Sequence, residues 1–217
     1  MLVGERMSKP VITITPDTPL QEALALMRKE KVRRFPVVDK HGKLVGIVSE
    51  KDLLNASPSD ATTLSIWEVN YWLSKVKVEE IMTKEVITTC ADCPIEEAAR
   101  VMADRKIGAL PVMEDSRLVG IITETDLFKI FLELFGARKG GIRATILVKD
   151  EPGKLSEVTN AIRQLNANII AIGTFMGEDP STGLVTIKVE GTTVEALTQA
   201  LTPIVERIVD IRNVSAA

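Results

Sequence analysis

A seven-residue signature occurs twice in this chain of 217 residues. The stretch Gly46–Asp52 reads GIVSEKD, and it returns as GIITETD at Gly120–Asp126. The match extends outward, because Met7–Thr13 is similar to Met82–Thr88. Only two copies are present, and each is longer than the repeating unit of a solenoid protein. The sequence therefore predicts a tandem pair of small folded modules.

Each repeat carries signals for a strand, a helix, two strands and a short helix. In the first repeat, Thr18–Gln21 predicts a helix start, with a hydroxyl cap and a proline at the first helical position. Apolar residues then recur at helical spacing along Leu20–Met27. Strands are expected at Phe35–Asp39 and Leu44–Ser49, and Glu50–Leu54 opens the second helix. The second repeat retraces this order.

The composition excludes several classes of function. The net charge of −3 and the isoelectric point of about 5.4 give no basic surface for DNA or RNA. No apolar run approaches the roughly 20 residues of a membrane span. The first residues, Met1–Arg6, lack the pattern of a signal peptide. We therefore expect a cytoplasmic protein that binds neither nucleic acid nor membrane.

The last third of the chain has a different pattern. Glycines at 136, 140 and 141 predict a flexible joint after an apolar helix. The elements expected after this joint are strand 143–148, helix 155–165, strands 168–176 and 184–189, helix 194–206 and strand 208–214. The order βαββαβ predicts a ferredoxin-like sandwich, in which two helices cover one face of a sheet.

These features carry a family resemblance. Each half of residues 1–135 resembles a CBS domain, the pair resembles a Bateman module, and the tail resembles an ACT domain through Lys149–Leu155. With the linker Ala56–Ser59, the whole arrangement is similar to the acetoin-utilisation AcuB-like proteins. The resemblance implies an α+β fold in which a pseudo-twofold pair of β-α-β-β-α CBS domains precedes a βαββαβ ACT domain. The expected boundaries are 1–63 and 78–135 for the CBS repeats, 64–77 for a linking helix, 136–141 for a linker and 142–217 for the ACT-like domain. It also implies a regulatory sensor of AMP, ADP, ATP or S-adenosylmethionine, with no catalytic residue, metal or other cofactor.

Two apolar segments favour self-association. A capping box at Ser65–Glu68 predicts the linking helix, which holds Trp67, Tyr71 and Trp72. The helix before the joint is also apolar over Ile130–Phe135. Together they exceed what a small domain easily buries, so we expect a homodimer or a higher even-numbered oligomer.

The repeated signature suits a nucleotide. A glycine on a strand allows a sugar to approach the backbone, and a helix start favours phosphate through its free N–H groups. The hydroxyl can bond a phosphate or the chain, and the aspartate three residues later can accept ribose hydroxyls. These positions are Gly46, Ser49 and Asp52 in the first repeat and Gly120, Thr123 and Asp126 in the second. The alternative is that the glycine only permits close packing and that the aspartates are helix-start residues that favour the helix dipole.

The two repeats differ in charge. Arg33, Arg34 and Lys51 of the first repeat align with Gly108, Ala109 and Thr125 of the second. This difference indicates one cleft suited to a polyphosphate, in which apolar strand residues such as Ile12 and Val38 hold the adenine. The alternative is that the two arginines form a solvated surface pair. The sequence leaves open which of the two clefts they reach.

The remaining reactive residues have structural interpretations. Cys90 and Cys93 have the C-x-x-C spacing of a thiol oxidoreductase, which is the alternative function. They align with Thr15 and Thr18, however, so Cys93 is expected at a helix cap and Cys90 at a strand end. The only histidine, His41, falls in a predicted turn, which excludes a four-ligand zinc site within one chain and a hydrolytic triad.

The ACT resemblance implies an amino-acid site between paired ACT domains. The loop containing Asp150 and Gly153 leads to a helix start at Leu155, and Asn168 opens the next strand. Glu151 adds a negative charge beside the place expected for the ligand carboxylate. A purely dimerising role for this domain is therefore an equal alternative.

Overall fold

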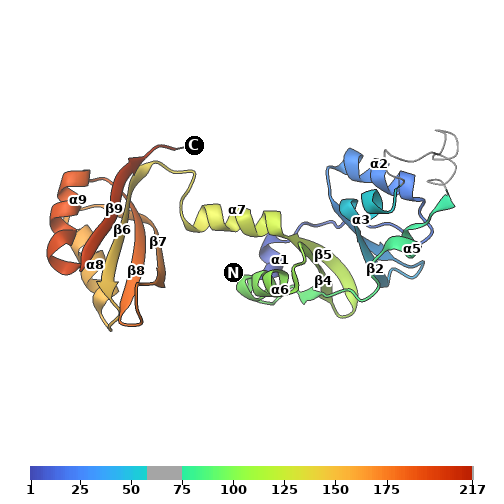
Figure 1. Cartoon of the computed structure of the whole chain (residues 1–217), viewed down its shortest axis with the longest axis horizontal. Helices are drawn as coiled ribbons and strands as arrows, with labels where there is room; N and C mark the ends of the chain where they lie inside the picture. The colour runs from blue at the N-terminus through green and yellow to red at the C-terminus, as the bar shows by residue number, and fades with distance from the viewer. Residues whose placement is uncertain (58–74, 217) are drawn as a thin grey trace. The chain divides into compact units, whose positions relative to one another are not determined.

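The computed structural model describes residues 1–57 and 75–216. The chain divides into two units, Met1–Leu127 and Phe128–Ala217, and each is described by itself (Figure 1). Residues 64–74 of the predicted linking helix lie outside the described residues, and they include the capping box at Ser65–Glu68 and the residues Trp67, Tyr71 and Trp72. Pro58 and Ser59 of the predicted linker lie outside them as well.

The first unit contains both copies of the signature. Its elements are α1 (Val3–Arg6), α2 (Leu20–Glu30), β1 (Arg34–Val38), β2 (Leu44–Ser49), α3 (Glu50–Asn55), α5 (Val78–Ile81), β3 (Thr89–Cys90), α6 (Ile95–Arg105), β4 (Ala109–Glu114), β5 (Arg117–Thr123) and the start of α7 (Glu124–Leu134). Strands β1 and β2 pair antiparallel, as do β4 and β5. The first strand expected in each repeat is short: β3 in the second repeat, and a single bridge from Ile14 to Val37 in the first.

The helix starts differ from the sequence prediction by one residue. Pro19 is the N-cap of α2, with extended backbone, and Pro94 is the N-cap of α6. Thr18 therefore does not cap the helix, and its hydroxyl oxygen instead accepts a hydrogen bond from the backbone N–H of Thr15 at 3.2 Å. The equivalent residue Cys93 is likewise outside the cap position, whereas Cys90 ends β3 as expected.

The two repeats exchange their first helical turns. Val3, at the start of the first repeat, is buried in the core built by α6, β4 and β5 of the second. Val78, at the start of the second repeat, is buried in the core built by α2, β1 and β2 of the first. Backbone hydrogen bonds fix both contacts, from Val3 N–H to Cys93 O and from Val78 N–H to Thr18 O, each 3.0 Å long. Neither core is complete within one sequence repeat.

The same exchange explains the glycines of the signature. A Cβ atom added to Gly46 would overlap the thioether sulfur of Met82, and one added to Gly120 would overlap that of Met7. Met82 and Met7 follow the exchanged turns α5 and α1 at equivalent positions. The space at each glycine is therefore filled by a methionine side chain. This geometry supports the packing interpretation of the glycines.

The exchanged packing makes a testable prediction. Gly46→Ala should lower the free energy of unfolding by about 1 kcal/mol, because the new methyl group overpacks against Met82. In the Met82→Ala background, Gly46→Ala should cost much less stability, because the side chain that the new methyl group would overlap is gone. Urea unfolding of the wild type, the two single variants and the double variant measures this coupling in a double-mutant cycle. If the two effects only add, the side chains do not touch in solution.

The second unit is a four-stranded antiparallel sheet with two helices on one face. Its elements are β6 (Gly141–Lys149), α8 (Lys154–Gln164), β7 (Asn168–Met176), β8 (Thr182–Glu190), α9 (Val194–Leu201), a 3₁₀ turn (Thr202–Ile204) and β9 (Arg207–Val214). The strand order is β7-β8-β6-β9, and Figure 1 shows α8 and α9 on the same side of the sheet. The predicted ferredoxin-like βαββαβ fold is confirmed. Helix α9 ends at Leu201 rather than at Glu206, because Pro203 in the 3₁₀ turn has no N–H to continue it.

Among the described residues, the structure contains no helix with the length and apolar character needed to cross a membrane.

Candidate functional site

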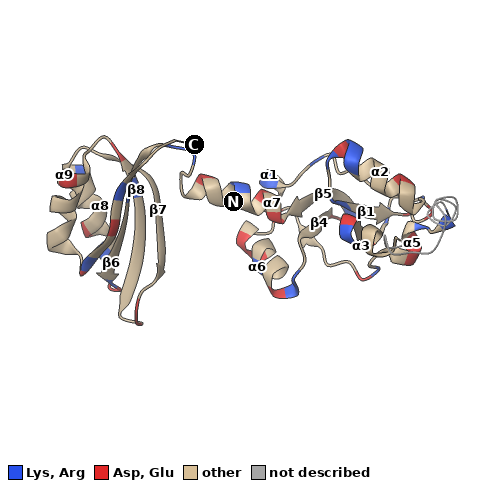
Figure 2. Cartoon of the chain, turned by 45° about the horizontal axis from the view of Figure 1, so that its top comes forward, with Lys and Arg blue, Asp and Glu red and all other residues tan. Residues whose placement is uncertain are grey.

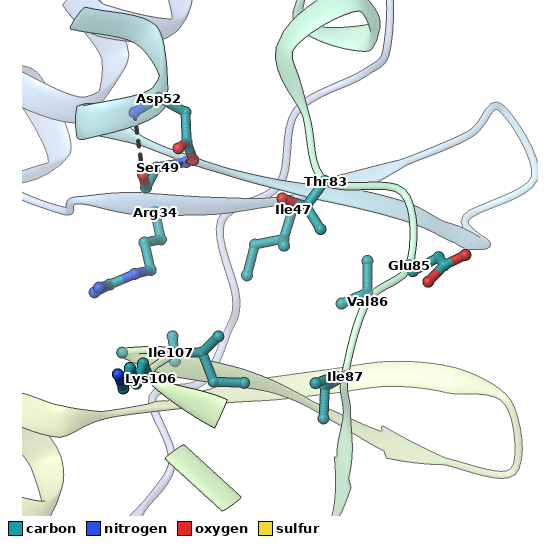
Figure 3. A pocket seen from close by; sticks show the side chains of 12 residues that line it. Arg34, Ile47, Ser49, Asp52, Thr83, Glu85, Val86, Ile87, Lys106 and Ile107 are labelled. Atoms are coloured by element: carbon teal, nitrogen blue, oxygen red, sulfur yellow. Dashed lines mark hydrogen bonds between the residues drawn. The ribbon is translucent and has the colours of Figure 1, made fainter. Parts of the chain in front are cut away.

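A cavity of about 340 Å³ lies between the two repeats of the first unit (Figure 3). Its lining residues are Arg34, Ile47, Ser49 and Asp52 from the first repeat and Thr83, Glu85, Val86, Ile87, Lys106, Ile107, Gly108 and Ala109 from the second. In Figure 3, Ile47 points from β2 into this space, and Ile87 and Ile107 lie across from it. The cavity thus has apolar walls with charged groups at its edges, and its volume is at the low end for small-molecule pockets.

Ser49 and Asp52 are fixed by a capping box at the start of α3. Asp52 Oδ2 accepts hydrogen bonds from Ser49 N at 2.9 Å and from Ser49 Oγ at 2.6 Å, while Ser49 Oγ accepts one from Asp52 N at 3.2 Å. Within the described part of the chain, no hydrogen bond uses the other carboxylate oxygen, Asp52 Oδ1. The box therefore orients the carboxylate and leaves one oxygen for a ligand donor.

The second repeat has the same box. Asp126 Oδ2 accepts from Thr123 N at 3.1 Å and from Thr123 Oγ1 at 2.7 Å. Asp126 is only 7% exposed, whereas Asp52 is half-buried beside the cavity. The first copy is therefore the more accessible of the two carboxylates.

Three backbone N–H groups at each of these helix starts are already hydrogen-bonded within the chain. In addition to the two groups in the box, Glu50 N–H donates to Arg33 O at 2.9 Å, and Glu124 N–H donates to Gly108 O at 3.2 Å. These particular N–H groups are therefore occupied by the protein itself. Phosphate contacts from side chains then gain importance for the site.

The two arginines separate. Arg34 lines the cavity that contains Asp52, and its guanidinium occupies the space where a side chain at Gly108 would stand. Arg33 Nη2 instead donates to Thr125 Oγ1, at 3.4 Å, in the second copy of the signature. Of the two arginines, Arg34 lines the cavity that contains Asp52 and Arg33 does not. Lys51, the third predicted cation, is exposed and is not among its lining residues.

Sequence reasoning missed Lys106, which also lines this cavity. Lys106 ends α6 in a left-handed conformation with φ 55°, and Lys31 ends α2 in the same way with φ 54°. The duplication aligns these two lysines, and that alignment was the signal available in the sequence. Glu85 is a second missed lining residue, and Figure 3 shows it on the opposite side of the view from Lys106.

The predicted adenine-holding residues lie outside this cavity. Ile12 is 36% exposed, and Val38 ends β1 opposite Leu44. The duplication aligns Ile12 with Ile87, which does line the cavity. The apolar side chain beside Asp52 therefore comes from Ile87 and not from Ile12, because sequence alone does not show which halves face each other.

The ACT-like unit has a separate cavity of about 860 Å³. Asp150, Gly153 and Leu155 line it together with the ends of β7 and β8. Asn168 does not, because it lies at the opposite end of β7, where its Nδ2 donates to Glu190 Oε1 at 2.8 Å. Within one chain, Asn168 is therefore not part of the cavity that the loop lines.

The charge of Glu151 in this loop has a partner. Lys154 Nζ lies 3.9 Å from Glu151 and 2.7 Å from Glu157. The hydrogen bond to Glu157 is the main reason that the pKa of Lys154 is raised. The positive charge of Lys154 therefore offsets the negative charge of Glu151 beside the cavity.

The reactive residues considered in the sequence form no thiolate site. Cys90 and Cys93 are joined in a disulfide. Ligand-type atoms of Cys90, Asp92 and Cys93 lie within 4.8 Å of one another, but the oxidised sulfurs are not thiolate ligands. His41 lies in the turn after Asp39, whose Oδ1 accepts from its backbone N–H at 2.8 Å.

Solved structures similar to this chain contain CBS domains. The CBS domain pair of protein MJ0100, in complex with 5′-methylthioadenosine and S-adenosyl-L-methionine, is 34% identical with a TM-score of 0.52, and the match covers 64% of this chain and 98% of that one. A putative acetoin utilization protein (AcuB) from Vibrio cholerae is 32% identical with a TM-score of 0.52, covering 63% and 93%. The protein CBSX2 in complex with AMP is 29% identical with a TM-score of 0.52, covering 61% and 97%.

Several curated relatives are enzymes. The L-aspartate semialdehyde sulfurtransferase of Methanocaldococcus jannaschii is 35% identical over 131 residues, which are 60% of this chain. The match spans 23% of the length of that enzyme.

The family comparisons cover both units. The CBS domain family matches residues 3–59 and 78–133, and the TTHA0829-like ACT domain family matches residues 140–212. CBS and ACT domains are regulatory modules. The chain belongs to the CBS domain family, and it joins two CBS domains to one TTHA0829-like ACT domain.

Proposed function

We propose that this protein is a regulatory sensor that binds an adenine nucleotide in the cavity between its CBS domains. The observation that carries the proposal is the geometry of Asp52, whose Oδ2 is held by Ser49 while Oδ1 remains available beside the cavity. The adenosine-containing ligands of the similar structures, AMP, 5′-methylthioadenosine and S-adenosyl-L-methionine, support it.

The lining residues suggest how the nucleotide lies. We place the adenine between Ile47 and the apolar side chains of Ile87 and Ile107, and the ribose hydroxyls on Asp52 Oδ1. Arg34 and Lys106 then supply charge-assisted contacts to phosphate. The same two cations repel the sulfonium of S-adenosylmethionine, so the cavity favours AMP or ADP over that ligand.

Calorimetric titration of the full chain with AMP, ADP, ATP, S-adenosylmethionine and adenosine tests this proposal. We expect saturable binding of the nucleotides, weaker binding of S-adenosylmethionine, and a rise in melting temperature with nucleotide concentration. Absence of saturable binding by every adenine ligand would contradict it.

We further propose that the second unit receives the signal, either as a dimerising module or as an amino-acid sensor using Asp150, Gly153 and Leu155. The domain boundaries given above are part of this proposal. So is the assignment of the protein as a cytoplasmic regulator without catalytic activity.

Self-association is expected from exposed apolar side chains on α7. Phe128, Phe131 and Leu134 are 69%, 54% and 59% exposed, respectively. Such a patch favours burial against another protein surface, so we propose a homodimer or a higher even-numbered oligomer. Light scattering at micromolar concentration should report twice the chain mass or an even multiple of it, and a monomeric mass would refute the assignment.

The disulfide makes the thiol oxidoreductase alternative testable. Replacing both Cys90 and Cys93 by serine should leave AMP affinity unchanged, because neither residue lines the nucleotide cavity. The wild-type protein should not catalyse the reduction of a model disulfide by a dithiol. Catalysed disulfide exchange that disappears in the double variant would instead support the enzyme interpretation.

A further inference from the structure

The open face of the ACT sheet carries a row of three cations. Arg143 on β6 pairs directly with Lys188 on β8 and with Arg212 on β9. Residues directly opposite on neighbouring strands point to the same face, and the adjacent Ile142 and Ala144 belong to the core beneath α8 and α9. The three cations therefore face away from the helices. Figure 2 colours lysines and arginines blue.

One carboxylate serves this row. Asp210 Oδ2 accepts from Arg143 Nη1 at 3.3 Å, and Asp210 Oδ1 accepts from Arg212 Nε at 2.8 Å. The hydrogen bond from Arg212 is the main cause of a lowered pKa for Asp210, which keeps the carboxylate ionised. Two arginines thus share a single negative charge.

Lys188 has no carboxylate at all within the described ranges. The residue is 6% exposed, and its Nζ donates to the backbone carbonyl of Gly136 at 2.8 Å. An ammonium has three donors, so two remain. Like charges directly opposite each other destabilise a sheet, and a buried charge is costly without a counter-ion. The row therefore has an unmet requirement for negative charge.

A cavity of about 290 Å³ opens onto this charge. Arg143, Thr186 and Lys188 line it together with apolar atoms of Phe135, Ala171 and Val214. Phe135 lies over the sheet, where Gly173 leaves room for its ring. A Cβ atom at position 173 would lie only 2.7 Å from that ring. The cavity therefore offers cations and a hydroxyl beside short apolar walls.

We propose that this cavity binds a small organic carboxylate. Its carboxylate group contacts Lys188 and Arg143, and its short carbon chain lies against Phe135 and Val214. The cavity shares no lining residue with the larger one at Asp150–Leu155, so it is a second site in the ACT-like unit and is independent of nucleotide binding.

A purely structural role accounts for only part of this arrangement. Lys188 bonds a carbonyl just after the C-terminus of α7, where a cation is favourable. That role needs neither Arg143 beside Lys188 nor the cavity between them. The two interpretations differ in what Arg143 does to carboxylate binding.

The test is calorimetric titration of the full chain with acetate, succinate and inorganic phosphate at constant ionic strength in chloride. We expect saturable binding of a carboxylate, and Lys188→Met and Arg143→Gln should each weaken it by about tenfold or more. Arg163→Gln on α8, which removes the same charge from an exposed position, should change nothing.

Three results would overturn the proposal: no saturable carboxylate binding by the wild type, binding of phosphate alone, or wild-type affinity in Arg143→Gln. Lys188→Met risks misfolding because Lys188 is buried, whereas the side chain of Arg143 is 43% exposed. Arg143→Gln therefore decides the outcome if the other variant does not fold.

Discussion

Asp52→Asn should lower the affinity for AMP by about 5- to 150-fold, which corresponds to about 1–3 kcal/mol for a lost acceptor at a desolvated site. The amide retains one oxygen that can accept from Ser49 and so preserve part of the capping box. It loses the charge and the second acceptor oxygen, Oδ1, to which we assign the ribose. Isothermal titration calorimetry measures the change.

The matched control is Asp39→Asn. Asp39 lies in the turn of the same repeat, where its Oδ1 accepts from the backbone N–H groups of His41 and Lys43 at 2.8 and 2.9 Å, and it is not among the cavity residues. This variant loses the same charge and should bind AMP like the wild type. If Asp52→Asn binds AMP as tightly as Asp39→Asn does, the ribose is not held by Asp52.

The second large effect separates the two arginines. Arg34→Ala should weaken ADP binding by at least about tenfold, since a hydrogen bond to a charged group contributes about 1.5–3 kcal/mol. Adenosine should bind almost as well as before, because its apolar contacts are to Ile47, Ile87 and Ile107. The ratio of the two affinities, measured by calorimetry, is the result that matters.

Arg33→Ala is the natural control, because Arg33 contacts Thr125 in the other copy of the signature. It should leave ADP binding in the first cavity unchanged. If Arg33→Ala weakens ADP and Arg34→Ala does not, the nucleotide occupies the opposite cleft. If both ligands weaken equally in Arg34→Ala, this arginine supports the fold and not a phosphate.

The local parts of this structure could be predicted from the sequence. Hydrogen bonds between residues three apart need no knowledge of the rest of the chain, so the positions of Ser49 and Asp52 at a helix start follow from the signature itself. The periodicity of apolar residues likewise located α2, α6 and the βαββαβ order of the second unit.

Contacts between the repeats could not be predicted. Val3 is buried in the second repeat, and Met82 packs against Gly46 of the first. Both contacts depend on how two similar halves pack. From the duplication alone, each first turn could pack on its own repeat or on the other one. For the same reason, the sequence does not show that Ile87, rather than its equivalent Ile12, lines the cavity beside Asp52. Asn168 lies outside the cavity at Asp150–Leu155 for another reason: the two ends of the nine-residue strand β7 are too far apart to line one pocket of the same chain.

A crystal structure of the full chain grown with saturating ADP is the most direct test of the nucleotide site. We predict ribose hydroxyls within hydrogen-bonding distance of Asp52 Oδ1, adenine between Ile47 and Ile87, and phosphates facing Arg34 and Lys106. ADP density elsewhere, with this cavity empty, would contradict the account.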